Sequence, residues 1–414
     1  MLTSPLLRAV RSLHFQQDRR AELRGISPLE WPALLKSTDR SQITLPLGIR
    51  CRDDLPDFVR NRIDRNLVGN VLRYQRITAE YRLVADALRS RSIDFIVVKG
   101  LSQVAPLYIS DPVYRPQYDI DLYCPPEFLT SARDAMVDAG FAPIKPDRKR
   151  ADHLPAMIRN RDWKWRGDYY DPDLPLTVEI HFRFWDQHTE RFPAPCVEHF
   201  WQRRSSRIIQ GLDIPMLSLR DGVSYSALHL VRHLLRGDLR AYHVYELAHF
   251  LHQTEHHHDL WSTWRSDRTR TSSPIEAVAF RLAAEWFGCK LHPIADEAVR
   301  TLSPGVARWF ELFSHSPLAL EKPNKDELLL HLSMVDGLSD RCAIVARRLF
   351  PLRAPKLVDP TPADGTKSLR VSACAEFRQF KFTARRAIYH VRATVPLIRS
   401  LFRWKMSTRK YAVS

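Results

Sequence analysis

The segments F-I-V-V-K-G (residues 95–100) and Y-R-P-Q-Y-D-I-D-L-Y (residues 114–123) decide the fold of this chain. The second segment places Asp119 and Asp121 two residues apart within a run of apolar, β-prone side chains. Because residues i and i+2 of a strand point to the same face of a sheet, both carboxylates should project side by side. Two carboxylates directed at one point suit a hard divalent cation such as Mg²⁺.

The residues before the aspartate pair predict how the chain reaches it. Residues 93–98 are typical of a buried strand, and Lys99 and Gly100 follow where the chain must turn. A glycine at this turn permits a positive φ or a close approach of the backbone. Lys99 either meets a phosphate as a point charge or is a solvated lysine at a strand end. A strand, a glycine turn, a helix and an aspartate pair on a neighbouring strand suit phosphoryl or nucleotidyl transfer.

Arg115 and residues 176–184 add further polar groups. Arg115 either grips a phosphate with both ends of its guanidinium group, or binds a carboxylate and braces the strand of Asp119. Residues 176–184, L-T-V-E-I-H-F-R-F, alternate between apolar and polar side chains, which predicts a strand with Glu179 and His181 on its polar face. His181 either contacts an acceptor molecule or is a hydrogen-bonded structural histidine.

The motifs Val98-Lys99-Gly100, Tyr108, Arg115 and Asp119-Ile120-Asp121-Leu122 together resemble the bacterial "uncharacterised nucleotidyltransferase" family. This family belongs to the DNA polymerase beta-like nucleotidyltransferase superfamily. Other members of the superfamily have a Gly-Ser or Gly-Gly turn before the aspartate pair, whereas this family and this chain have Lys-Gly. The resemblance covers roughly residues 60–255, well over a third of the chain.

The resemblance implies an α+β enzyme core that transfers an NMP from an NTP to a hydroxyl acceptor with Mg²⁺ or Mn²⁺. Asp119 and Asp121 would share the metal ions, and Glu179 would be the third carboxylate of the site. Asp168 and Asp186 are the next acids to consider if Glu179 points away from the pair. Catalysis of this kind consists mostly of positioning and charge stabilisation.

A predicted helix at residues 225–251 carries His229 and His233 at i and i+4. Such a pair can bind a metal, but the H-E-x-x-H pattern of zinc enzymes is absent. In the resembled family, a helix with His-x-x-x-His and a downstream arginine and acid packs over the active site. Arg240 and Glu246 match these positions loosely. We therefore expect a substrate-facing or structural network of these side chains rather than a zinc site.

The composition describes a folded and strongly basic chain. Its 414 residues, with 44% hydrophobic residues and ten tryptophans, predict two or three domains with a large core. The six cysteines contain no C-x-x-C pair, which predicts a cytoplasmic protein, and the basic tail leaves a peripheral position at a membrane open. The net charge is +16, and twelve lysines or arginines against one acid lie between Lys367 and Lys410. The excess positive charge is therefore concentrated in the tail.

Shifts in pattern divide the chain into five expected parts. These are an N-terminal helical region (1–90), a nucleotidyltransferase core (91–200), a helical domain (201–350), a proline-rich linker (351–366) and a basic helical tail (367–414).

Within the core, hydrophobic patterns predict a small mixed β-sheet. The expected strands are 93–98, 118–123, 141–144, and a hairpin in which 163–170 pairs with 176–184.

The basic tail allows three interpretations: a solvated helical extension, a contact with nucleic acid such as RNA, or a contact with an anionic membrane. Phe402, Trp404 and Tyr411 stand among its basic residues, which suits either kind of contact. Two alternatives to the enzyme therefore stay open, a non-catalytic nucleotide-binding regulatory module and a nucleic-acid-binding protein that acts through its tail. The sequence leaves the acceptor open among a small molecule, a peptide, a protein side chain and RNA, and leaves the NTP and the oligomeric state open.

Overall fold

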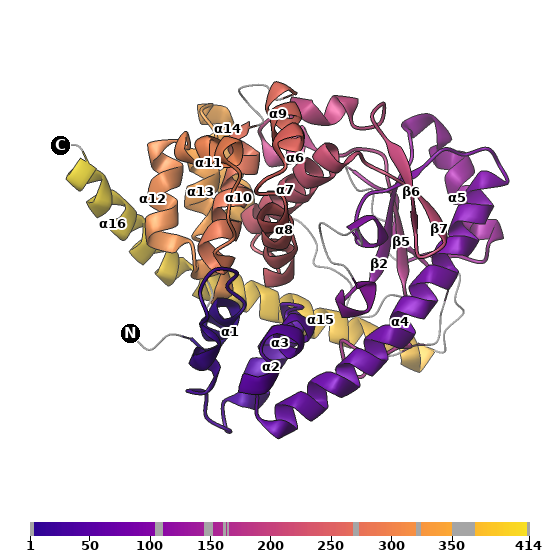
Figure 1. Cartoon of the computed structure of the whole chain (residues 1–414), viewed down its shortest axis with the longest axis horizontal. Helices are drawn as coiled ribbons and strands as arrows, with labels where there is room; N and C mark the ends of the chain where they lie inside the picture. The colour runs from indigo at the N-terminus through magenta and orange to yellow at the C-terminus, as the bar shows by residue number, and fades with distance from the viewer. Residues whose placement is uncertain are drawn as a thin grey trace.

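A computed structural model describes residues 4–103, 111–144, 152–159, 163, 165–267, 273–319, 324–349 and 369–411. Figure 1 shows one twisted β-sheet on one side of the molecule, with helices on both of its faces and further helices beyond them. The fold is therefore α+β, as the sequence predicts. Tyr108 and the proline-rich segment 351–366 lie outside the described residues.

The strands of the described residues form one mixed sheet in the order β3-β4-β5-β2-β1-β7-β6. Strand β2 pairs with β5 in parallel and with β1 in antiparallel orientation, and β1 pairs with β7 in parallel. The strands are β1 (Ile96–Val97), β2 (Asp119–Tyr123), β3 (Ala142–Pro143), β4 (Met157–Ile158), β5 (Thr177–His181), β6 (Ser205–Ile209) and β7 (Leu212–Met216).

One face of the sheet is apolar and packs against two helices, α4 (Asp57–Arg89) and α5 (Leu129–Asp138). Ile120 of β2 and Val178 of β5 are buried in this layer together with side chains of both helices. Within the expected N-terminal helical region (1–90), α4 forms a single helix of 33 residues. The alternation of β2 and β5 explains this layer, because every second residue must point to the same side.

The other face of the sheet carries the polar residues and lies opposite α7 (Leu219–Arg236) and α8 (Ala241–Gln253). Aromatic contacts join the sheet to α7, since Tyr123 stacks on Phe184 with ring centroids 4.0 Å apart, and Phe184 meets Tyr225 edge to face. These rings belong to the larger of the two apolar clusters, which also includes buried side chains from residues 1–63 and 275–344.

Further helices complete the larger cluster and the tail. Before the sheet they are α1 (Pro5–Ser12), α2 (Trp31–Arg40) and α3 (Thr44–Arg50). After it come α6 (Gln187–Glu190), α9 (His258–Ser266), α10 (Ser273–Phe287), α11 (Pro293–Arg300), α12 (Pro304–Phe313), α13 (Glu327–Ser333), α14 (Leu338–Leu349), α15 (Leu369–Arg392) and α16 (Thr394–Tyr411).

The predicted hairpin of residues 163–170 with 176–184 is wrong. No described residue of 163–170 lies in a strand, and β4 pairs with β5 in its place, Met157 opposite Val178. The reason lies in α4, where Arg73 donates hydrogen bonds to the carbonyl groups of Tyr169 and Asp171. Carbonyl groups bound to this buried arginine are not free for a strand ladder.

The hairpin of β6 and β7 was not predicted from the sequence. Its two strands are joined by Gln210 and Gly211, both of which have positive φ angles. A two-residue loop ending in glycine is a known hairpin signal, so the sequence did contain the information.

A test of the α4 packing uses Gly69, which lies against the carbonyl oxygen of Tyr170 so closely that an added Cβ would overlap it. Replacing a helical glycine by alanine ordinarily stabilises a helix by about 1 kcal/mol. We expect the opposite sign here, a loss of about 1–3 kcal/mol for Gly69→Ala in urea unfolding, because the backbone of residue 170 must move. The exposed neighbour Val68 provides the control, since Val68→Ala should change stability by less than about 0.5 kcal/mol. A Gly69→Ala protein as stable as the wild type would contradict this packing.

Candidate functional site

The parallel pairing of β2 with β5 brings the predicted carboxylates together. Asp121 lies directly opposite Glu179 in the register, and Asp119 lies opposite Thr177. Asp121, Glu179 and His181 each place one possible ligand atom within 4.8 Å of the others. Glu179 therefore faces Asp121, as expected of a third carboxylate. Its role in binding a metal stays a prediction.

The two alternative acids have structural roles elsewhere. Asp168 accepts a hydrogen bond from the backbone N–H of Tyr170 at 2.8 Å. Asp186 caps the amino end of α6 by accepting from the N–H of Thr189. The geometry gives no reason to place either one in the site.

The charges of the site are strongly coupled. Burial raises the pKa of Asp119 to about 6, with a further upward contribution from Asp121, while Lys99 acts in the opposite direction. Burial would also raise the pKa of Asp121, but Lys99 and His181 outweigh it and hold that pKa well below its usual range. One carboxylate is thus firmly ionised, and its neighbour lies in a setting that resists a second negative charge.

Lys99 is the cation that balances Asp121. Its Nζ lies 2.9 Å from Asp121 Oδ1 and 3.5 Å from His229 Nε2. Burial lowers the pKa of Lys99, yet the surrounding acids, Asp121 foremost, leave it above its usual value. The ammonium group is therefore charged although the side chain is largely enclosed.

Gly100 allows the chain to turn tightly behind the aspartates. Its φ is +65°, and an added Cβ would overlap the side-chain amide of Gln117. That amide donates to the backbone carbonyl of Asp119 at 2.7 Å. The turn thus needs glycine for its backbone conformation and for the space that holds Gln117 against β2.

Of the two roles predicted for Arg115, its contacts fit the second, in which it binds a carboxylate and braces the strand of Asp119. Its Nε donates to Glu246 Oε1 at 2.6 Å, and its Nη2 donates to Glu246 Oε2 at 3.2 Å and to Gln103 Oε1 at 2.8 Å. Gln103 in turn accepts from the N–H of Gly100 and donates to Ser226 on α7. This buried network ties the turn and the approach to β2 to α7 and α8. Gln103 was not predicted as a site residue, because its partners are distant in sequence and no local pattern indicates such contacts.

The predicted histidine pair forms part of a three-histidine cluster. His229 and His233 approach with their Nε2 atoms 3.0 Å apart, and His233 Nδ1 lies 2.8 Å from Asp238 Oδ1. The third member, His243 of α8, has its ring centroid 5.1 Å from that of His229 and was not predicted. Burial, followed by the charge of Lys99, holds the pKa of His229 well below its usual range, so this ring is neutral.

A second group of unpredicted residues borders Glu179. His153 Nε2 lies 3.9 Å from Glu179 Oε2, and the adjacent Asp152 forms an ion pair with Arg232 at 3.0 Å. His153 forms an isolated bridge with His181, whose Nε2 lies 3.0 Å from Asp121 Oδ1. Only the tertiary fold brings residues 152–153 here, and the sequence around them gives no signal.

Arg240 stands at the solvent side of the site. It is exposed, forms no ion pair with a described residue, and lowers the pKa of Asp119 through its charge. Unlike Lys99 and Arg115, it has no carboxylate partner among the described residues and can bind an external anion.

Comparison with known protein families identifies the family of this chain. A family model described as "Uncharacterised nucleotidyltransferase" matches residues 27–288, more than half of the chain. The chain belongs to this nucleotidyltransferase family. No curated protein and no solved structure gives a significant match. The matched range is wider than the resemblance seen in the sequence. It contains every candidate site residue and supports nucleotidyl transfer in general.

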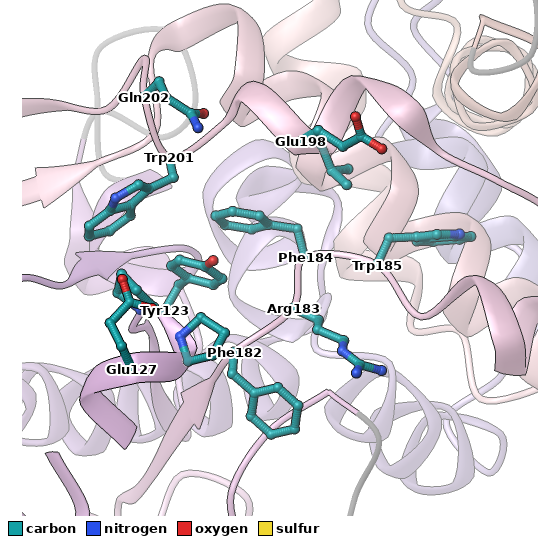
Figure 2. Close-up of a pocket in the computed structure, with 12 residues that line it drawn as sticks. Tyr123, Glu127, Phe182, Arg183, Phe184, Trp185, Glu198, Trp201 and Gln202 are labelled. Atoms are coloured by element: carbon teal, nitrogen blue, oxygen red, sulfur yellow. The ribbon is translucent and has the colours of Figure 1, made fainter. Parts of the chain in front are cut away.

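An aromatic cavity of about 360 Å³ opens beside the site of this nucleotidyltransferase (Figure 2). It lies beyond the carboxyl ends of β2 and β5, where Tyr123, Phe184 and Trp201 cluster in Figure 2. Tyr123 follows Asp119 and Asp121 on the same face of β2, so the cavity continues the line of the carboxylates. None of the candidate catalytic residues lines the cavity itself.

The bracing role of Arg115 in this nucleotidyltransferase can be tested by measuring the free energy of unfolding. Arg115→Met should cost about 3–5 kcal/mol in urea unfolding, because it leaves the buried carboxylate of Glu246 without its partner. The double variant Arg115→Met/Glu246→Leu should regain much of that loss, since no buried charge remains. As a control, Arg240→Met should change stability by less than about 0.5 kcal/mol. A stable Arg115→Met protein with weakened nucleotide binding would instead assign Arg115 to a phosphate.

Proposed function

We propose that this protein is a metal-dependent nucleotidyltransferase that moves an NMP from an NTP to a hydroxyl acceptor. One observation carries the proposal: Asp119, Asp121 and Glu179 come together on two parallel strands in a chain of a nucleotidyltransferase family. The opposite pKa shifts of the neighbouring Asp119 and Asp121 are the expected property of a site built to receive positive charge. The DNA polymerase beta-like superfamily, to which the family is similar in its motifs, supports the same chemistry.

The donor set fits a divalent cation. Carboxylate oxygens are the preferred ligands of Mg²⁺ and Mn²⁺, and Asp119, Asp121 and Glu179 would hold the ion. The raised pKa of Asp119 supports this, since burial beside Asp121 leaves an excess of negative charge that a cation would relieve. When bound, the metal would neutralise charge on the phosphates and make the acceptor hydroxyl a better nucleophile.

Glu179 is the acid best placed to take the proton of the acceptor. Its side chain is 23% exposed, whereas that of Asp121 is 3% exposed. An acceptor molecule can therefore reach Glu179 from solvent, while Asp121 is enclosed by Lys99 and His181. His181 orients Asp121 and is in that sense a positioning residue.

Lys99 and Arg240 supply positive charge for the triphosphate. A triphosphate bound over the carboxylates would meet the ammonium group of Lys99 from inside the site and the guanidinium group of Arg240 from the solvent side. His229, kept neutral, adds no competing charge next to Lys99. The acceptor stays open among a small molecule, a peptide, a protein side chain and RNA.

The first test of the function is loss of turnover without loss of fold. Pyrophosphate release is measured with each of the four NTPs, Mg²⁺ or Mn²⁺, and cell extract as the source of acceptor. Asp119→Asn and Asp121→Asn should each lower the rate at least about a hundredfold, because metal binding supplies several kcal/mol of transition-state stabilisation. Excess EDTA should abolish release.

Asp138→Asn is the matched control for these variants, because Asp138 is an exposed acid on α5, outside the site. It should retain the wild-type rate. Nucleotide binding without pyrophosphate release in the wild type would favour a regulatory module. Wild-type release by either site variant would disprove the assignment of the carboxylates.

A second test concerns Lys99. Lys99→Ala should raise the KM for the NTP by about tenfold or more, because a charge-assisted contact to phosphate contributes about 1.5–3 kcal/mol. The KM for the acceptor should change much less. Lys99→Arg, which keeps the charge, should recover part of the nucleotide affinity. An unchanged NTP affinity in Lys99→Ala would restrict Lys99 to balancing Asp121.

A further inference from the structure

Helices α15 and α16 carry an apolar stripe that faces solvent. The stripe consists of Ile388, Val391, Val395, Ile398, Phe402 and Met406, which are each between 48% and 72% exposed. Their spacings of three and four residues put them on one side of the helices. On the helical rise of 1.5 Å per residue, the stripe is about 27 Å long. Contiguous exposed apolar surface of this kind marks an interaction site rather than ordinary surface.

The stripe is not the face with which the tail packs on the protein. Ala393, Leu397 and Ser400 are buried and occupy the opposite side of the helices. Trp404 continues that buried side and stacks on Phe313 of α12, with ring centroids 6.5 Å apart. Figure 1 shows α16 beside α12 at the edge of the molecule. The body of the protein thus holds α16 by one face and leaves the apolar stripe outward.

A row of basic side chains runs beside the stripe. Its members are exposed and recur at spacings of four, seven, seven and four residues, which place them on the same flank of the helices: Lys381, Arg385, Arg392, Arg399 and Arg403. None of the five forms an ion pair with a described residue, although Arg403 lies over the ring of Phe313 on α12 and Lys381 over the ring of Phe377. Glu376 is the sole acid of α15 and α16. The outward face is therefore apolar along its centre and positively charged along one flank.

We propose that this face of α15 and α16 docks on an anionic lipid surface, with the apolar stripe in the headgroup boundary and the basic row on lipid phosphates. Amphipathic helices bind membranes in this way, through buried apolar area together with attraction to anionic lipids. None of the helices that the structure describes has the length and hydropathy of a membrane span.

Charge and shape favour a lipid surface over the other occupants. Bases of RNA stack on aromatic rings. The exposed Phe377 and Phe380 of α15 precede the stripe on the same side, but within the stripe five of the six residues have no ring. A basic row beside an apolar line complements a layer of anionic headgroups above hydrocarbon. This docking surface is separate from the carboxylate site and does not depend on the proposed transferase activity.

The test is co-sedimentation of the full chain with phosphatidylcholine vesicles, with and without phosphatidylglycerol. The wild type should bind the anionic vesicles much more tightly than the neutral ones, and added salt should weaken that binding. Ile398→Glu/Phe402→Glu should lower the partition coefficient at least about tenfold, because two apolar side chains no longer enter the lipid boundary. Arg392→Glu/Arg399→Glu should lower it at least about tenfold as well.

Matched controls lie outside the tail. Leu29→Glu changes an apolar residue that is 92% exposed, and Arg65→Glu/Arg82→Glu reverses two exposed charges on α4. Both control proteins should bind anionic vesicles as the wild type does. Circular dichroism and thermal unfolding establish that each variant is folded. The comparison of neutral and anionic vesicles with the wild type needs no variant and tests the proposal even if one fails to fold.

Three outcomes would overturn the docking proposal. The first is a wild type that does not bind anionic vesicles. The second is vesicle binding that Ile398→Glu/Phe402→Glu leaves intact, because the stripe would then take no part. The third is a wild-type dimer that the same variant converts to a monomer while vesicles are not bound, which would assign the stripe to a second copy of the chain.

Discussion

The ion pair between Lys99 and Asp121 is the interaction on which the candidate site depends. Parallel pairing of β2 with β5 sets Asp121 opposite Glu179, and Asp119 adds a third acid on which the charges of both act. Like charges that are close and buried disfavour ionisation. The ammonium group of Lys99, 2.9 Å from Asp121, offsets this repulsion. Because Lys99 lies two residues beyond the end of β1, the balance requires that β1 lie next to β2, as the order of the sheet provides.

The same two strands serve the core and the site through opposite faces. Ile120 and Val178 pack into the apolar layer with α4 and α5, while Asp121 and Glu179 point the other way. A slip of one residue in β2 would exchange these faces, burying carboxylates in the apolar layer. The hydrophobic core therefore favours the register that brings the acids together. The free-energy cost of burying a carboxylate in the apolar layer favours the same register.

Prediction from the sequence succeeded where the signal is local. The period of two in residues 118–123 and 176–184 places Asp119, Asp121 and Glu179 on strands β2 and β5. Prediction failed where the residues that contact each other are distant in sequence. The hydrogen bonds from Arg73 that hold residues 169–171 away from the sheet join elements about a hundred residues apart. The contacts of Gln103 and His153 are of the same kind, since neither residue lies in a periodic pattern.

Cations occupy two different electrostatic settings in this protein, and the net charge of +16 conceals the difference. Lys99 and Arg115 are enclosed, and each has a carboxylate partner, so their fields are largely balanced within the site. The arginines on the outer flank of α15 and α16 form no ion pair with a described residue. Exposed charges of that kind act at a distance and are screened within about 10 Å at moderate salt, whereas buried pairs are screened much less. Salt should therefore alter encounters of the tail with an anionic partner far more than the charge balance of the carboxylate site.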